Sequence, residues 1–484
     1  MTDNKTIKTL LNSCGYGLSK KHFDKDIINK LRKELTVSPK TMNSFGIVND
    51  NSFPVYQESE KRVYIPKFLG LQRFGLPDKD KIKDGTDIDL KFNGELRENQ
   101  KGPVQAFLDA AYDDTRCGGL ITLGCGGGKT CCSLYIISKL SKKTLVIVHK
   151  DFLLKQWRER IEQFLPDARV GLIKAKVIDI EDKDIVVGSL QSLSMKEYDK
   201  GTFDEFGFVI IDECHHIGSE VFSRALQKIN CKYALGLSAT MTRKDGLTKV
   251  FKWHIGDVVY KSREKKKDNV DVLCYEYFVE DMKYSNEVLM FNGKPNMARM
   301  INNICEYEPR IDKIINIINN IKKKENNRNI LILSDRRNHL KQMKDKLDLK
   351  KIGNPGYYVG GMKDEELKKS EEECDILLGT FSMASEGMDI PKLDTIILAS
   401  PKSDIVQSVG RILRKKEEDR IYVPLIIDIN DMFSMFINQN KKREKYYKKC
   451  KYNITKKSNI KKNENNIEND MNITKYKQGI CYIK

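Results

Sequence analysis

The chain of 484 residues contains no apolar run long enough to cross a lipid bilayer. Its first five residues are mostly polar and do not form the apolar core of a signal peptide. The twelve cysteines include no C-x-x-C pair, and the six histidines are scattered apart from His215 and His216. These absences argue against a membrane protein, a zinc site and a disulfide framework. We therefore expect an intracellular protein with reduced thiols.

Charge is distributed unevenly along the chain. Apolar residues make up 40% and charged residues 32% of the sequence, as in a folded, soluble protein, and the formal net charge is +18. Residues 441–484 alone carry fourteen Lys or Arg against four Asp or Glu. A basic chain suits a polyanionic partner such as nucleic acid, but here the charge belongs more to this tail than to the rest. In this tail we expect a helix near residues 443–452, with Tyr446 and Tyr447 packed. Beyond Asn453 we expect disorder, because the sequence is rich in Lys and Asn.

A glycine-rich stretch follows an apolar segment, residues 120–123, and precedes a helical pattern that begins at Cys131. This order of strand, glycine-rich turn ending in Lys-Thr and helix is typical of a site that binds nucleotide phosphates. Glycine allows the backbone of the turn to bend so that its N–H groups converge on an anion. The expected nucleotide-binding residues of this loop are Cys125, Gly126, Gly127, Gly128, Lys129 and Thr130. Lys129 would reach the outer phosphates of ATP, and the Thr130 hydroxyl would bind Mg²⁺. Leu123 stands where the common pattern has a glycine.

Alternating apolar strands and helical segments predict two parallel α/β domains. In the first domain, we expect strands at residues 120–123, 144–148, 184–188, 208–211 and 233–237, with a helix at 152–164. In the second domain, we expect strands at residues 329–335, 356–360, 374–380, 395–399 and 423–428. The second domain lacks a glycine-rich loop, which suggests two lobes that close on one nucleotide. Residues 1–94 predict a small, partly β module with strands near 53–56 and 62–66.

Two acidic residues, Asp212 and Glu213, follow the apolar strand at 208–211. Open parallel sheets bind ligands at the carboxyl ends of their strands. Asp212 is therefore the expected Mg²⁺ ligand and Glu213 the residue that orients the attacking water, the alternative being two acids at a helix N-terminus. Upstream, the amide of Gln100 can read an adenine edge because it donates and accepts at once. By itself, an ordinary surface glutamine is the simpler interpretation.

The second domain contributes two further sets of candidate residues. Gln407, Arg411 and Arg414 recur at helical spacing, which places them on one predicted face. Two guanidinium groups on one face can clamp a triphosphate, and an arginine that meets the γ-phosphate only on closure makes hydrolysis depend on closure. The alternative is a solvated basic helix, because two lysines follow directly. The other set is residues 384–391, which include Gly387 and Asp389.

The order of these motifs resembles that of the superfamily 2, or DEAD/DEAH-like, helicases over roughly residues 95–430. In chain order the motifs are Gln100, residues 126–130, 154–157, 191–193, 212–215, 238–240, 387–389 and 407–414. The chain is most similar to the XPB-type transcription and repair helicases and their relatives in large DNA viruses. Leu96-Arg97-x-x-Gln100 and Leu123-x-Cys125-Gly126 carry this similarity. Arg243-Lys244-Asp245 departs from the Arg-Glu-Asp that this branch often has.

The resemblance implies two tandem RecA-like P-loop-type domains and a nucleic-acid-dependent ATPase that uses ATP and Mg²⁺. The residues it assigns to catalysis are Lys129, Asp212, Glu213, Arg411 and Arg414. The residues it assigns to nucleotide binding, besides the glycine-rich loop, are Gln100, Asp212, Gly387, Asp389 and Gln407. The implied partners are nucleic acid, DNA rather than RNA, and the transcription machinery. The Lys-, Asn- and Ile-rich composition is compatible with a viral source, which would add the virion as a location.

We expect an accessory module at 1–94, a helicase ATP-binding domain at 95–262, a connecting segment at 263–325, a helicase C-terminal domain at 326–440 and a basic tail at 441–484. The function that follows is an ATP-driven helicase or translocase in transcription or repair. One alternative is an ATPase-deficient nucleic-acid-binding scaffold, against which the full set of catalytic residues argues. The other is the motor subunit of a restriction-type complex, against which the lack of a nuclease motif argues.

Overall fold

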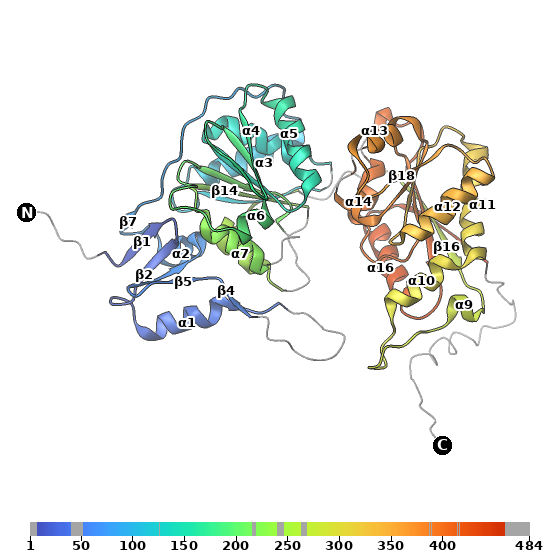
Figure 1. Ribbon diagram of the computed structural model, residues 1–484, viewed down its shortest axis with the longest axis horizontal. Helices are drawn as coiled ribbons and strands as arrows, with labels where there is room; N and C mark the ends of the chain where they lie inside the picture. Colours follow the sequence, from blue (N-terminus) through green and yellow to red (C-terminus); the bar gives the residue numbers. More distant parts are fainter. Residues whose placement is uncertain are drawn as a thin grey trace, which may run out of the picture. The chain divides into compact units, whose positions relative to one another are not determined.

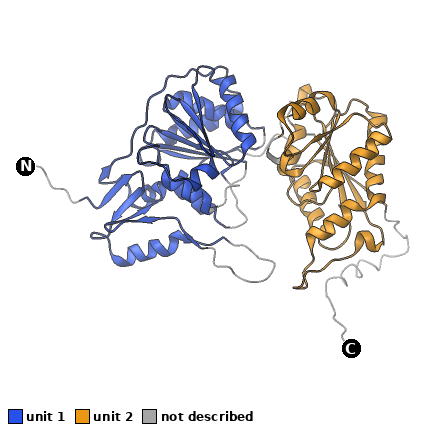
Figure 2. Cartoon of the chain, viewed as in Figure 1, with its two compact units in different colours: residues 1–266 blue, residues 267–484 orange. Residues whose placement is uncertain are grey.

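The computed structural model describes residues 7–39, 52–124, 126–214, 219–239, 246–262, 269–386, 388, 390–413, 415 and 417–459. The chain divides into two compact units, residues 1–266 and 267–484 (Figure 2). Each unit contains its own large sheet flanked by helices, which confirms the expected α/β class with two tandem domains. Across these described ranges, no helix combines the length and the apolar character that a membrane crossing requires.

The large sheet of unit 1 has eight strands in the described part of the chain. In spatial order they are β11 (Val177–Asp179), β10 (Val170–Lys174), β12 (Ile185–Ser189), β9 (Thr144–Val148), β13 (Phe208–Ile211), β14 (Tyr233–Ser238), β8 (Gly118–Thr122) and β15 (Val258–Lys261). Neighbouring strands are parallel except β11, which is antiparallel to β10. The five strands predicted for this domain are present as β8, β9, β12, β13 and β14.

Helices cover both faces of this sheet (Figure 1). One face carries α3 (Glu98–Ala111), α4 (Lys129–Leu140) and α5 (Asp151–Phe164), and the other carries α6 (Leu190–Met195), α7 (Ser219–Lys228) and α8 (Thr248–Ile255). The side chains of β9 divide accordingly: Val146 and Val148 pack in the first core cluster, Leu145 and Ile147 in the second. Burial on both faces explains why the strands are continuous apolar runs rather than alternating ones.

A smaller sheet near the N-terminus also belongs to unit 1 and confirms the expected β-rich module. Its strands are, in spatial order, β5 (Gln57–Glu58), β6 (Arg62–Ile65), β2 (Gly15–Ser19), β1 (Thr9–Asn12) and β7 (Lys79–Asp80), and β3 (Thr36–Val37) pairs with β4 (Phe53–Pro54) beside α1 (Lys25–Leu35). Its core includes Val250 and Trp253 of α8. Lys67, the first residue of α2 (Lys67–Phe74), donates to the carbonyl oxygens of Cys231 and Lys232 at 3.1 and 2.5 Å. These contacts attach the small sheet to the large one.

The sheet of unit 2 is wholly parallel over the residues that the structure describes. Its seven strands are, in spatial order, β18 (Pro355–Tyr358), β19 (Ile376–Gly379), β17 (Ile330–Leu333), β20 (Thr395–Leu398), β21 (Leu425–Asp431), β16 (Asp271–Tyr277) and β22 (Asn453–Ser458). The five predicted strands of this domain are present as β17 to β21. The strand β16 lies in the polar segment 263–325, and it pairs with β21 along its whole length.

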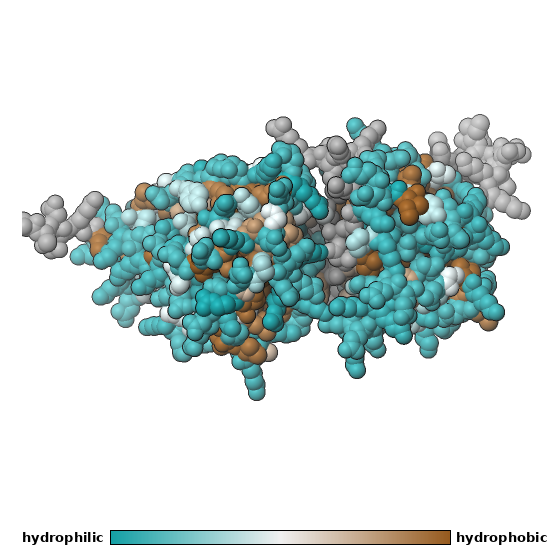
Figure 3. Space-filling model, turned by 90° about the horizontal axis from the view of Figure 1, so that it is seen from above, coloured by the Kyte–Doolittle hydropathy of each residue, from teal (hydrophilic) through white to brown (hydrophobic). Residues whose placement is uncertain are grey.

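Unit 2 also has helices on both faces of its sheet. One core cluster holds α10 (Met297–Glu306), α11 (Glu308–Lys324) and α12 (Arg337–Leu349), and another holds α14 (Phe381–Glu386) and α15 (Val406–Val409). The remaining helices of the described chain include α9 (Met282–Ser285), α13 (Asp364–Glu373) and α16 (Phe436–Lys449). The helices α10 and α11 are separate, and Pro309 stands in the first turn of α11. Hydrophilic residues dominate the described surface seen in Figure 3.

The prediction of disorder beyond Asn453 is wrong for residues 453–458. These residues form β22, which pairs in parallel with β16, from Asn453 opposite Asp271 onward. Strand pairing uses backbone groups, so a Lys-rich strand at the edge of a sheet meets no penalty and is also protected against pairing with other chains. The preceding α16 is attached to the core through Arg443 and Tyr447, which are 1% and 0% exposed. Residues 460–484 lie outside the described residues.

Candidate active site

The glycine-rich loop connects β8 to α4. Gly126 and Gly128 have φ angles of 76° and 79°, in the left-handed region that favours glycine. Gly128 is also the N-cap of α4, and its carbonyl oxygen accepts from the N–H of Cys132 at 2.9 Å. A Cβ atom on Gly128 would lie 2.0 Å from Nε2 of Gln100, so a larger residue fits there only if the Gln100 side chain moves. Cys125, which the sequence also assigns to the nucleotide, lies outside the described residues.

The loop leads directly into the N-terminus of α4, a helix of 12 residues. Lys129 and Thr130 are its first two residues, and the N–H groups of a helix's first turn have no acceptor within the helix. The helix dipole adds partial positive charge at the same place. The arrangement is therefore suited to a phosphate group.

Lys129 and Glu213 form an ion pair between the Nζ and Oε1 atoms, although 84 residues separate them in the sequence. Their side chains are 13% and 19% exposed. The sheet brings them together: β8, β14 and β13 are neighbours and run parallel, so their carboxyl ends lie at one edge. Glu213 has a φ angle of 46°, which residues other than glycine rarely adopt and which is typical of functional sites.

Asp212 precedes Glu213 and is 6% exposed. Its Oδ1 atom accepts from the backbone N–H of Glu213 at 2.9 Å, and its Oδ2 atom accepts from Nε1 of Trp157 at 2.9 Å. Burial raises the pKa of the Asp212 carboxyl above its ordinary value, and the positive charge of Lys129 opposes this shift. The two acids thus differ in their surroundings: Asp212 is held by neutral donors and Glu213 by a cation.

Sequence reasoning missed the bond made by Trp157. The predicted helix at 152–164 contains this residue, and the structure buries its side chain, at 1% exposure. The periodicity of α5 reports burial but carries no information on where an indole N–H points. The one signal available was the residue type, because a buried tryptophan usually finds an acceptor for its N–H.

Gln100 lies in α3 and is 3% exposed, so it is not an ordinary surface glutamine. Its Oε1 atom accepts from the backbone N–H of Arg97 at 2.9 Å, in a capping box at the start of the helix. Its Nε2 atom faces Gly128. The structure therefore places Gln100 against the phosphate-binding loop, as a residue that helps to shape it.

The donor set near the loop fits Mg²⁺ bound together with a nucleotide. Within the described ranges, no group of three or more His, Cys, Asp or Glu side chains is placed to hold a metal ion. Mg²⁺ does not need such a group, because it takes one or two protein ligands and completes its coordination with water and phosphate oxygens. Asp212 offers a carboxylate whose oxygens each have two lone pairs and accept one of the bonds described above. Thr130 adds a hydroxyl at the start of α4.

In unit 2, Arg411 is 8% exposed. Its guanidinium donates to the carbonyl oxygens of Ala384 and Met388 at 2.5 and 2.6 Å. These bonds connect the arginine to α14 and to the segment that follows it. Three other candidates of this unit, Gly387, Asp389 and Arg414, lie outside the described residues.

The helix expected to carry Gln407, Arg411 and Arg414 is short. The α-helix α15 ends at Val409, and a 3₁₀ helix, Gly410–Leu413, continues it. Glycine is a weak helix former and supports such a change of helix type. Gln407 is half-buried in α15, so the helical spacing read from the sequence does not translate into one regular α-helical face.

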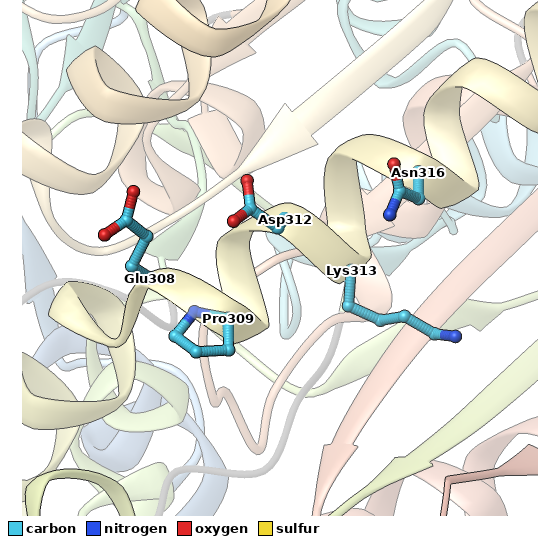
Figure 4. Close-up of a pocket in the computed structure, with 5 residues that line it drawn as sticks. All are labelled: Glu308, Pro309, Asp312, Lys313 and Asn316. Carbon is cyan, nitrogen blue, oxygen red and sulfur yellow. The ribbon is translucent and has the colours of Figure 1, made fainter.

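A surface depression in unit 2 lies along α11 (Figure 4). Its lining residues are Glu308, Pro309, Asp312, Lys313 and Asn316. Figure 4 shows that all five project from a single helix. Two of their carboxylates, those of Glu308 and Asp312, pair with Nζ of Lys346 at 2.9 and 2.7 Å. None of the candidate residues lines this depression, and we do not assign it to the nucleotide.

Comparison with known proteins identifies the family. Residues 93–243 match the family described as type III restriction enzyme, res subunit, and residues 309–416 match the helicase conserved C-terminal domain. The chain is 36% identical over 462 residues to "Putative ATP-dependent RNA helicase L396" of Acanthamoeba polyphaga mimivirus. This match covers 93% of this chain and 87% of that protein. It is 27% identical over 381 residues to "Putative helicase 161L" of Invertebrate iridescent virus 6. This match covers 75% of this chain and 83% of that protein.

A solved structure supports the fold. The structure of S. cerevisiae Dbp5 bound to RNA and ADP BeF3 has a TM-score of 0.52 to this chain at 11% identity, over 79% of this chain and 96% of that one. The glycine-rich loop and the acidic pair fall in the first matched family region, and Gln407 and Arg411 fall in the second. The chain therefore belongs to the superfamily 2, DEAD/DEAH-like helicases, is related to the helicases of large DNA viruses, and is an ATP-hydrolysing enzyme.

Proposed function

We propose that the protein couples ATP hydrolysis to the opening of a nucleic-acid duplex or to movement along it, on DNA rather than RNA, in transcription or repair. The observation that carries this proposal is the ion pair between Lys129 and Glu213 beside Asp212. It brings together a phosphate-binding cation, a metal-binding carboxylate and a water-activating carboxylate. The DNA preference rests on the similarity to XPB-type helicases, whereas the mimivirus relative is named an RNA helicase.

In the proposed reaction, the loop and α4 hold the triphosphate. Backbone N–H groups at Gly126 and at residues 128–130 donate to phosphate oxygens, and the Lys129 ammonium offsets the charge of the outer phosphates. Thr130 and Asp212 would hold Mg²⁺, which would supply positive charge to offset that of the phosphate groups. Gln100 and Cys125 complete the pocket, and the Gln100 amide supports the loop at Gly128.

Glu213 orients the attacking water and accepts its proton. Its Oε1 atom is bonded to Lys129, so a triphosphate that binds the loop competes with Glu213 for the same ammonium group. As Lys129 turns toward phosphate, the Glu213 carboxylate becomes available to water. Substrate binding and water activation are in this way linked through one ion pair.

Residues of unit 2 are proposed to sense ATP and to couple hydrolysis to nucleic acid. They are Gln407, Arg411, Arg414, Gly387 and Asp389. The contact of Arg411 with the carbonyl oxygen of Met388 supports this grouping, because Met388 lies between two of them in the sequence. Guanidinium groups bind phosphate oxygens in a planar, bidentate manner, which makes arginine suited to this role.

Contacts with the nucleic acid are proposed near Gln156 in α5 and Gln191 in α6. Gln191 is exposed and Gln156 half-buried. Both are expected to track the phosphate backbone and to be largely independent of sequence.

The test is ATP hydrolysis by the full chain alone and with single-stranded DNA, double-stranded DNA or RNA, together with a strand-separation assay. Stimulation by DNA above that by RNA is the expected result. Stimulation by RNA alone would overturn the DNA preference, and a rate indifferent to every nucleic acid would overturn the coupling itself. Stimulation by duplex DNA without strand separation would overturn duplex opening and leave movement along the duplex, as in a motor of the restriction type, whose family matches residues 93–243.

A further inference from the structure

Trp157 connects α5 to the active site through a buried hydrogen bond. The side chain is 1% exposed and belongs to the core cluster of α3, α4 and α5. Its Nε1 atom donates to Oδ2 of Asp212 at 2.9 Å. An indole N–H is a donor only. Phenylalanine would fill much of the same space in the core without supplying that donor, so packing alone does not account for the bond.

Two donors hold the Asp212 carboxylate, and they come from different parts of the chain. Oδ1 accepts from the Glu213 N–H at the end of β13, and Oδ2 accepts from Trp157 in the middle of α5. The terminal torsion of an aspartate has no sharp preference, so a carboxylate with one donor can turn. With one donor on each oxygen, the plane of the carboxylate is fixed. Each oxygen retains a lone pair for a metal ion or its bound water.

We propose that Trp157 is a positioning residue for ATP hydrolysis: its indole N–H sets the orientation in which Asp212 receives the metal ion of Mg·ATP. This inference rests on the metal-binding role proposed for Asp212. Groups that hold a metal ligand from outside the coordination shell typically account for about a 10- to 100-fold effect on metal affinity or activity. The effect of Trp157 is therefore expected in the Mg²⁺ dependence of the reaction.

The chain offers a matched control, because its other tryptophan is also buried. Trp253 in α8 is 8% exposed, packs in the core of the N-terminal sheet and has Nζ of Lys249 at 5.1 Å from its ring. Trp157→Phe is expected to raise the Mg²⁺ concentration for half-maximal ATP hydrolysis roughly tenfold or more. Trp253→Phe should leave it unchanged. An unchanged Mg²⁺ half-point in the Trp157→Phe protein would overturn the proposal.

A second measurement does not require Trp157→Phe to fold. The sequence contains two tryptophans, so the Trp253→Phe protein has Trp157 as its sole indole. Adding Mg²⁺ to this protein in saturating ATP is expected to change its emission with the same half-point as hydrolysis, because the cation arrives at the carboxylate that accepts the indole N–H. ATP with EDTA should leave the emission unchanged. If the emission does not change when Mg²⁺ is added, or changes by the same amount with ATP and EDTA, the role of Trp157 is contradicted.

The proposed function and the role of Trp157 fail in different ways. If the unmodified protein hydrolyses no ATP at any Mg²⁺ concentration, the proposed use of Mg²⁺ fails. If hydrolysis requires Mg²⁺ and Trp157→Phe has the half-point of Trp253→Phe, only the role of Trp157 fails. Melting temperatures of both variants complete the comparison: a lower melting temperature with an unchanged half-point would make Trp157 a core residue and nothing more.

Discussion

Lys129 and Glu213 are joined by an ion pair although they follow different strands of the sheet. The pair is mostly buried, with side-chain exposures of 13% and 19%, so water and salt screen it less than a surface pair. It gives the cation of the phosphate-binding loop an anionic partner from within the protein. A triphosphate must therefore displace the Glu213 carboxylate from Lys129. Substitution of Lys129 and substitution of Glu213 are for this reason expected to change ATP affinity in opposite directions.

Lys129→Ala is expected to weaken ATP binding and to lower the rate of hydrolysis on the order of 10²- to 10³-fold, because the triphosphate loses a preorganised cation. Binding is measured by calorimetry and hydrolysis by phosphate release. Lys139→Ala is the control, because Lys139 is an exposed residue at the other end of the same helix. A Lys129→Ala protein that binds ATP as tightly as the Lys139→Ala protein would remove Lys129 from the phosphate site.

Glu213→Gln is expected to abolish turnover while ATP binding stays equal or becomes tighter. The amide cannot accept a proton from water, and it no longer competes with phosphate for Lys129. The loss of rate should be on the order of 10²- to 10⁴-fold, which is the range that general acid–base catalysis typically contributes. ATP affinity and single-turnover hydrolysis, measured on the same preparation, separate the two effects. Full turnover in this variant is incompatible with the assigned role.

Gly128→Ala and Gly126→Ala form a pair that separates backbone strain from steric conflict. Both glycines have a left-handed φ, so each substitution carries a strain of roughly 1–2 kcal/mol. A Cβ atom at Gly126 meets no atom within 4 Å, whereas one at Gly128 lies 2.0 Å from Nε2 of Gln100. Gly128→Ala should therefore lose more stability and more ATP affinity than Gly126→Ala, as measured by thermal unfolding and calorimetry. Equal losses in the two variants would show that the Gln100 side chain moves away from the new Cβ atom without a cost in free energy.

The sequence predicted that Lys129, Asp212 and Glu213 lie close together, because this depends on residue type and order. Lys129, Asp212 and Glu213 could be placed together because a phosphate loop and an acidic pair both follow apolar strands, and parallel strands end at one edge of a sheet. The pattern could not predict the ion pair itself, because the rotamers of Lys129 and Glu213 depend on the folded surroundings. The hydrogen bond from Trp157 to Asp212 could not be predicted for the same reason.

The fold was predictable where strands are buried on both faces, as in β9 and β13. It was not predictable at β22, because Lys- and Asn-rich residues give no apolar signal and the strand forms through its backbone pairing with β16. Arg443 shows the same limit. Read from the sequence it belongs to a basic tail, whereas the structure buries it in an ion pair with Asp428.

Arg443→Ala is expected to destabilise unit 2 by about 3–5 kcal/mol, because it leaves the buried carboxylate of Asp428 without its cation. Nε of Arg443 lies 2.9 and 3.0 Å from the two oxygens of that carboxylate, and Asp428 is 1% exposed. Both tryptophans lie in unit 1, so hydrogen exchange of peptides from unit 2 is the suitable measurement. Lys442→Ala, at the neighbouring exposed position, should change stability by less than about 0.5 kcal/mol. Similar exchange in the two variants would show that Asp428 finds another partner.

Acid is expected to destabilise unit 1 through His254. Burial lowers the pKa of this histidine from 6.5 to about 3, and within the described residues its Nε2 atom has no hydrogen-bond partner. Between pH 6.5 and about 3, His254 is therefore protonated in the unfolded chain and neutral in the folded chain. The stabilisation is complete above pH 6.5 and is lost as the pH falls toward 3, amounting to about 1.4 kcal/mol between pH 7.5 and 5.5.

Urea unfolding followed by tryptophan fluorescence measures this loss directly, because Trp157 and Trp253 both report on unit 1. His254→Phe keeps an aromatic ring beside Phe222, whose ring centroid is 6.0 Å away, and removes the titrating group. This variant should lose about 1.4 kcal/mol less than the unmodified protein between pH 7.5 and 5.5. An identical pH dependence in the His254→Phe protein would mean that the proton reaches His254 without unfolding, and that unit 1 opens locally around α8.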